Sequence, residues 1–116
     1  MKQFPMIQKP KRPTEFELQA DLYARLKAEK YDVRGEVSAY HDGTGSRMDL
    51  VIFVNGFASV VIEVKDTPHW DAVRGKKTRQ RRKYEQYGIP LLYYTPEFTI
   101  EGTLKRIRSL MKECGY

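Results

Sequence analysis

Leucines at four-residue spacing near the start of the chain predict an amphipathic helix over residues 14–30. The stripe consists of Leu18, Leu22 and Leu26. Thr14 and Glu17 stand at the spacing of a capping box, which marks the N-terminus of a helix. At 100° per residue, Glu15 falls in the middle of the leucine stripe, whereas Glu17 lies well away from it. Glu17 is therefore expected to cap the helix, and Glu15 is an acid on its core-facing side.

Three segments rich in β-branched and aromatic residues follow the first helix. They predict strands at residues 31–40, 48–54 and 57–64. The last two are almost wholly apolar, which is typical of central strands covered on both faces. Asn55 and Gly56 between them are a strong signal for a two-residue hairpin turn. These two strands are therefore expected to be antiparallel neighbours.

The second half of the chain predicts a helix at about residues 70–87, a strand at residues 91–94 and a helix at residues 100–112. The resulting order α-β-β-β-α-β-α indicates an α/β fold with a mixed central sheet flanked by helices. Residues 1–13 carry three prolines and four basic residues and are expected to form a flexible arm. Such an arm is either a frayed terminus or a strap on a nucleic-acid backbone. Residues 14–116 are expected to form a single domain.

Composition narrows the classes of function. The 116 residues include 21 Lys or Arg and 15 Asp or Glu, which gives a net charge of +6. A domain this basic most often meets a polyanion such as nucleic acid. The single cysteine excludes an internal disulfide and a cysteine-based zinc site. The sequence shows neither a membrane span nor a secretory signal, so we expect a cytoplasmic protein. A chain this short buries little surface, which makes a homo-oligomer plausible.

Three charged residues interrupt the apolar strands. Asp49 opens one strand, Glu63 stands near the end of the next, and Lys65 shares the face of Glu63 because strands alternate with a period of two. With a two-residue turn, paired positions sum to 111, so Asp49 opposes residue 62 and points away from Glu63. A bulge or a longer turn would bring the two carboxylates together.

Charges on buried strands are costly unless they pair or hold a cation. One interpretation is an ion pair of Lys65 with Asp49 or Glu63 at the end of the sheet. The other is a metal site, because Asp49, Glu63 and Glu15 offer six carboxylate oxygens, which suit Mg²⁺ or Mn²⁺. Such an ion would polarise a phosphate and lower the pKa of a bound water. Lys65 would stabilise the charge that develops on phosphorus, or orient the water.

The motif of Asp49 followed by Glu63, Val64 and Lys65 resembles the signature of the PD-(D/E)XK nuclease superfamily, which includes many restriction enzymes and junction resolvases. The resemblance covers residues 14–94 and extends to the α-β-β-β-α-β order. It is greatest to small stand-alone nucleases and to the nuclease part of type I restriction subunits. It implies a restriction-endonuclease-like core and Mg²⁺-dependent hydrolysis of DNA phosphodiester bonds by in-line attack of a metal-activated water.

The resemblance also implies a set of metal ligands. Asp49 and Glu63 would bind the ion, and the Val64 carbonyl would be an extra ligand. An acid on the first helix belongs to the family pattern. Three residues are candidates for it: Glu15, which fits best by its helix face, and Glu17 and Glu36 as substitutes.

Some branches of the family carry a Gln-x-x-x-Tyr pair on the helix after the third strand, and here Gln80 and Tyr84 match it. The resemblance places Gln80 near the metal waters or the DNA backbone, with Tyr84 as its support. Basic residues in the same region and beside Asp49 are candidates for phosphate contacts. These are Arg47, Lys76, Lys77, Arg79, Arg81 and Lys83.

A metal-dependent DNA nuclease is therefore the function that the sequence predicts. The alternative is a catalytically dormant nucleic-acid-binding subunit of a larger assembly. Sequence specificity would need long loops, a dimer or a protein partner, since no separate recognition domain is evident in the chain.

Overall fold

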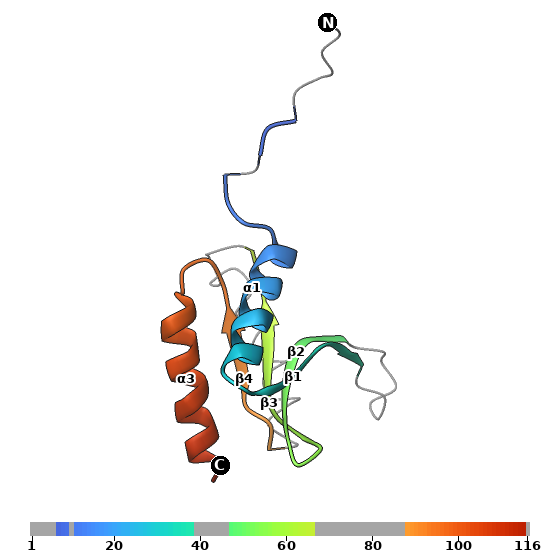
Figure 1. The fold of residues 1–116 in the computed structure, drawn as a ribbon, viewed down its shortest axis with the longest axis vertical. Helices are drawn as coiled ribbons and strands as arrows, with labels where there is room; N and C mark the ends of the chain where they lie inside the picture. The colour runs from blue at the N-terminus through green and yellow to red at the C-terminus, as the bar shows by residue number, and fades with distance from the viewer. Residues whose placement is uncertain (1–6, 10, 39–46, 67–87, 116) are drawn as a thin grey trace, which may run out of the picture.

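The computed structural model describes residues 7–9, 11–38, 47–66 and 88–115. Within these ranges the chain forms two helices and four strands (Figure 1). They are α1 (Glu15–Ala28), β1 (Asp32–Ser38), β2 (Arg47–Val54), β3 (Phe57–Val64), β4 (Leu91–Tyr94) and α3 (Ile100–Glu113). The predicted α/β class is confirmed, whereas the helix predicted at residues 70–87 lies outside the described residues. Neither α1 nor α3 combines the length and the apolar character that crossing a bilayer requires.

Local signals set the first helix. The Thr14 hydroxyl accepts a hydrogen bond from the Glu17 backbone N–H at 3.1 Å, and the Thr14 N–H donates to Glu17 Oε2 at 3.4 Å. This is the predicted capping box, which satisfies two of the N–H groups that a helix N-terminus leaves without partners. The three leucines of the predicted stripe are all buried. The cap and the stripe together fix where α1 begins and which face it turns to the sheet.

The four strands form one mixed sheet in the order β1-β2-β3-β4. The β1/β2 and β2/β3 pairs are antiparallel, and β3/β4 is parallel. A parallel pair needs a crossover connection of a dozen or more residues. Here the connection runs from Val64 to Leu91, and most of it lies outside the described residues.

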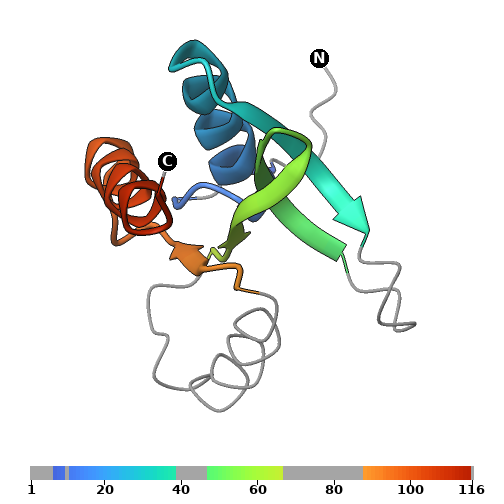
Figure 2. The same ribbon diagram turned by 90° about the horizontal axis from the view of Figure 1, so that it is seen from below.

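Both faces of the sheet are buried. On one face α1 and α3 pack side by side, as Figure 2 shows, and close the larger core. This core includes Leu22, Leu26, Ile52, Ile62, Leu92, Leu104 and Ile107. The opposite face buries a second, smaller cluster of Met48, Val51, Val61, Leu91 and Tyr93. The two central strands therefore have the two-sided burial that their continuous apolar sequences predict.

A β-bulge in the β2/β3 hairpin sets the register of the candidate site. The turn has positive φ at Asn55 (53°) and Gly56 (83°), as a type I′ hairpin requires. Next to the turn Phe53 pairs with Ala58, but the following pair is Ile52 with Val60. One residue of β3 is therefore extra, and paired positions sum to 112 beyond it. When this register is continued past Leu50 and Ile62, Asp49 stands opposite Glu63. The bulge that would bring the two carboxylates together is therefore present.

The extra residue is Ser59, which is buried (4% exposed) and held by side-chain contacts. Its hydroxyl donates to the Ile52 carbonyl oxygen at 2.9 Å and lies 3.6 Å from Met111 Sδ on α3. Bulges disrupt the ladder locally and leave backbone groups in need of other partners. The serine hydroxyl supplies such a partner inside the core.

Substitution Ser59→Ala should reduce the free energy of unfolding by about 1–3 kcal/mol, because it leaves the buried Ile52 carbonyl oxygen without its donor. Urea unfolding followed by circular dichroism measures this change. The matched control is Ser109→Ala at an exposed position of α3, where the change should be within about 0.5 kcal/mol. Equal effects of the two substitutions would show that the hydroxyl does not secure the bulge.

Candidate active site

The predicted charged residues gather at one end of the sheet. Asp49 lies near the start of β2, Glu63 near the end of β3, and Lys65 directly after β3. Because the strands are antiparallel, these positions meet at the same end, and the bulge makes Asp49 and Glu63 directly opposed. Glu15 is the first residue of α1. Two strands and one helix thus contribute to one cluster.

The two carboxylates differ in their surroundings. Asp49 is half-buried, and its Oδ2 accepts a hydrogen bond from the Val64 backbone N–H at 2.7 Å. Glu63 is 4% exposed, and its Oε1 is buried with no hydrogen-bond partner among the described residues. A buried oxygen without a donor is unfavourable and needs an explanation in a native site. Asp49 is therefore anchored, whereas Glu63 has an oxygen that remains to be satisfied.

The pKa of Glu63 is raised from 4.5 to about 8. Burial is the largest cause, followed by the negative charge of Asp49 and a hydrogen bond with that carboxyl group. The charge of Lys65 acts in the opposite direction, and Glu15 adds a small upward effect. Without a further positive charge, Glu63 therefore keeps its proton at neutral pH.

Glu15 belongs to the same electrostatic cluster. It is half-buried, and burial is the largest cause of its raised pKa. Lys65 lowers this pKa, and the charges of Asp49 and Asp66 raise it. Glu15, one of the three candidates for the helix acid, is therefore an electrostatic neighbour of both Asp49 and Lys65.

Lys65 is positioned by its backbone and forms no ion pair in the described part of the chain. Its N–H donates to the Tyr94 carbonyl oxygen at 3.0 Å. The ion pairs found there involve Arg25, Arg34 and Arg47 instead. The alternative of a simple ion pair between Lys65 and Asp49 or Glu63 is therefore not what the structure contains.

The other two acid candidates have different partners. Glu17 closes the capping box of α1. Glu36 stands opposite Asp49 in the β1/β2 register and has a positive φ of 56°, which is rare for a residue with a side chain. Its carboxyl accepts from Gln19 Nε2 at 3.1 Å and lies 3.6 Å from the Arg47 guanidinium. Glu36 therefore lies next to the cluster, but its carboxyl group interacts with Gln19 and Arg47.

Gln19 is a residue of the site that the sequence analysis did not single out. Its Nε2 also donates to the Asp49 carbonyl oxygen at 3.2 Å, so it connects α1 with the backbone of a candidate ligand. Gln19 follows Glu15 by four residues and shares its helix face, and this spacing is the signal that could have identified it.

The predicted phosphate-binding residues are only partly described. Arg47 lies two residues before Asp49 and is paired with Glu36 at the surface, where both side chains are at least half exposed. Such exposed pairs contribute little free energy, so a phosphate can replace Glu36 at little cost. Seven other candidates lie outside the described residues: Gln80, Tyr84, Lys76, Lys77, Arg79, Arg81 and Lys83.

The donor set fits a hard divalent cation with few protein ligands. No group of three His, Cys, Asp or Glu side chains arranged to hold a metal occurs within the described ranges. Mg²⁺ is commonly held by one or two carboxylates, with waters and substrate phosphates completing its shell. The opposed Asp49 and Glu63, one with a buried oxygen lacking a donor, meet that requirement.

Glu63→Gln should remove a pH dependence of stability in metal-free buffer. Because folding raises the pKa of Glu63, the folded state binds the additional proton, and stability falls as pH rises from about 4.5 to about 8. Urea unfolding at pH 5 and pH 8.5 should show a loss that is larger in the wild type than in Glu63→Gln by more than about 1 kcal/mol. The control Glu113→Gln, at an exposed position, should lose as much stability between pH 5 and pH 8.5 as the wild type does. A wild-type slope in Glu63→Gln would contradict the raised pKa.

Comparison with known proteins places this arrangement in a family. No curated protein and no solved structure matches the chain. A family model described as the type I restriction enzyme R protein N terminus matches residues 14–105, a range that contains Glu15, Asp49, Glu63 and Lys65. Since the match spans most of the sequence, the chain belongs to the family of type I restriction enzyme R protein N-terminal domains.

Proposed function

We propose that the chain is a metal-dependent nuclease of the PD-(D/E)XK kind that hydrolyses phosphodiester bonds in DNA. The observation that carries this proposal is the buried Glu63 oxygen opposite Asp49, which has no donor among the described residues. Lys65, which forms no ion pair in the described part of the chain, supplies the cation that this chemistry needs. The restriction-enzyme family supports a role in DNA cleavage.

Asp49 and Glu63 would hold Mg²⁺ or Mn²⁺, with the Val64 carbonyl as an additional ligand and Glu15 acting directly or through water. The ion would polarise the scissile phosphate and lower the pKa of a bound water. Lys65 would donate a hydrogen bond to a phosphate oxygen on which charge develops, or orient the attacking water. No carboxylate of the described residues holds it in an ion pair. Gln19 keeps Asp49 in place through the hydrogen bond that its side-chain amide donates to the Asp49 backbone carbonyl oxygen.

The proposed partners are DNA and a further protein that supplies specificity. The family model describes the R protein of a type I restriction enzyme, and a role beside other subunits follows from that description by analogy. The net charge of +6 supports association with DNA in either arrangement.

Asp49→Asn and Lys65→Ala should each lower the rate of Mg²⁺-dependent plasmid cleavage by about 10²-fold or more. The first removes a charged ligand of the proposed metal, and the second removes the cation that acts on the reacting phosphate. Asp49→Asn keeps an oxygen that can accept from the Val64 N–H, so the fold should be retained. The assay follows conversion of supercoiled plasmid in Mg²⁺, Mn²⁺ or EDTA, with circular dichroism as the check on folding.

The matched controls are Asp32→Asn in β1 and Lys105→Ala in α3, both at exposed positions away from the cluster. They should cleave at the wild-type rate. Cleavage by purified Asp49→Asn at that rate would refute the assignment. Binding of plasmid without metal-dependent cleavage by the wild type would support the dormant nucleic-acid-binding subunit instead.

Mn²⁺ should stabilise the wild-type protein by about 2.7 kcal/mol when its concentration is 100 times the dissociation constant. Glu63→Gln should abolish this gain, because a neutral amide is a poor ligand for a hard cation. Thermal unfolding with and without Mn²⁺, together with calorimetric titration, measures both effects. The control Glu113→Gln should keep the full stabilisation by Mn²⁺. If Glu63→Gln keeps it and Glu113→Gln loses it, the metal binds elsewhere.

A further inference from the structure

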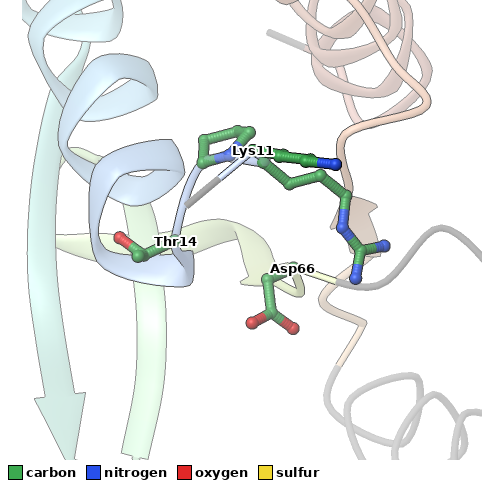
Figure 3. A pocket seen from close by; sticks show the side chains of 5 residues that line it. Lys11, Thr14 and Asp66 are labelled. Atoms are coloured by element: carbon green, nitrogen blue, oxygen red, sulfur yellow. The ribbon is translucent and has the colours of Figure 1, made fainter. Parts of the chain in front are cut away.

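A pocket of about 440 Å³ lies beside the carboxylate cluster and is separate from it. The described residues that line it are Lys11, Arg12, Pro13, Thr14 and Asp66 (Figure 3). Thr14 directly precedes Glu15, and Asp66 directly follows Lys65. The charge of Asp66 also raises the pKa of Glu15, so the pocket and the cluster are electrostatic neighbours. The volume is within the range of small-molecule sites, which begins at about 300 Å³.

The cations of this pocket are not neutralised within the described part of the chain. Lys11 and Arg12 are exposed, and neither takes part in any of the ion pairs found there. The α1 capping box occupies the Thr14 hydroxyl and the Thr14 N–H. The two basic side chains are therefore the groups of the pocket that can bind an anion. The negative charge of Asp66 repels an anion there. Figure 3 shows Lys11 and Asp66 bordering the pocket from the segment before α1 and from the end of β3.

We propose that this pocket binds one backbone phosphate of DNA, next to the phosphate that is cleaved. The inference rests on the proposed function for the position of the scissile bond, since the pocket adjoins Glu15 and Lys65 along the chain. Lys11 and Arg12 hold the flanking phosphate, and Asp66 limits the affinity by repulsion. Residues 11 and 12 of the basic arm thus act as a strap on the nucleic-acid backbone.

The test measures binding of a fluorescein-labelled DNA duplex by anisotropy in EDTA, where metal-dependent cleavage is absent. The double variant Lys11→Ala/Arg12→Ala should bind about 10-fold more weakly for every duplex sequence, because a phosphate contact carries no sequence information. The slope of log K against log salt should shrink by about 0.9, which corresponds to one phosphate. The control Arg108→Ala/Lys112→Ala removes the same charge from exposed positions of α3 and should change affinity less than about twofold.

Asp66→Asn gives an effect of opposite sign, which a folding defect would not produce. It should tighten binding about twofold or more, because it removes a negative charge from the pocket that receives the phosphate. Equal weakening by the Lys11/Arg12 and Arg108/Lys112 double variants, or unchanged binding in Asp66→Asn, would overturn the proposal.

A single uncharged methylphosphonate, moved along one strand of the duplex, locates the contact. On a duplex too short for a second binding register, one position of the neutral linkage should make wild type and Lys11→Ala/Arg12→Ala bind equally. Equality at no position would overturn the pocket assignment. Binding in EDTA is measured without cleavage, so the pocket and the nuclease proposal can fail separately. If the Lys11/Arg12 and Asp66 variants change DNA binding as expected but the wild type does not cleave DNA, the pocket assignment stands and the nuclease proposal is refuted. If the wild type cleaves DNA but these variants bind it unchanged, the nuclease proposal stands and the pocket assignment is refuted.

Discussion

The candidate site depends on a bulge at one residue of a β-hairpin. If Ser59 were paired in the ladder like its neighbours, the Asn55–Gly56 turn would pair Asp49 with position 62, and the two acids would lie on opposite faces of the sheet. The bulge changes the register by one residue between the turn and the end of the sheet. Its stability is a matter of core packing, because the Ser59 hydroxyl bonds to the Ile52 carbonyl and contacts Met111 of α3. The chemistry at one end of the sheet therefore depends on packing at the other.

The same register creates an electrostatic conflict. Glu63 is buried opposite Asp49, and its raised pKa keeps it protonated, which lowers the cost of the pair. A cation relieves the conflict in another way, by replacing that proton and satisfying the buried Glu63 oxygen. Protons and metal ions therefore compete for one pair of carboxyl groups. An apolar pair at these positions would give a more stable sheet, so this conflict is better explained by function than by folding.

Features with local causes could be predicted from the sequence, and features with distant causes could not. The capping box and the two-residue hairpin turn depend on adjacent residues, and both occur as predicted. The bulge remained one option among several, because its residue is held by α3, which is 41 or more residues away. The left-handed conformation of Glu36 carries no local signal, since it is held by Gln19 and Arg47 from other elements. The sequence also could not decide whether Lys65 forms an ion pair with Asp49 or Glu63. Composition and spacing are the same whether a lysine is paired or not, and only the distances in the folded chain distinguish the two cases.

The charges at this end of the sheet explain why a metal ion would be needed to bring the scissile phosphate to the carboxylates. Four acids lie there with three cations: Glu15, Asp49, Glu63 and Asp66 with Lys11, Arg12 and Lys65. Fully ionised, this group has one excess negative charge and repels a phosphate, and with Glu63 protonated it is neutral. A divalent cation makes the group positive and draws the polyanion toward the carboxylates. Arg47 does not alter this balance, because Glu36 is its partner. The ion would then draw the scissile phosphate to the carboxylates, and the basic arm would hold the flanking phosphate with or without it.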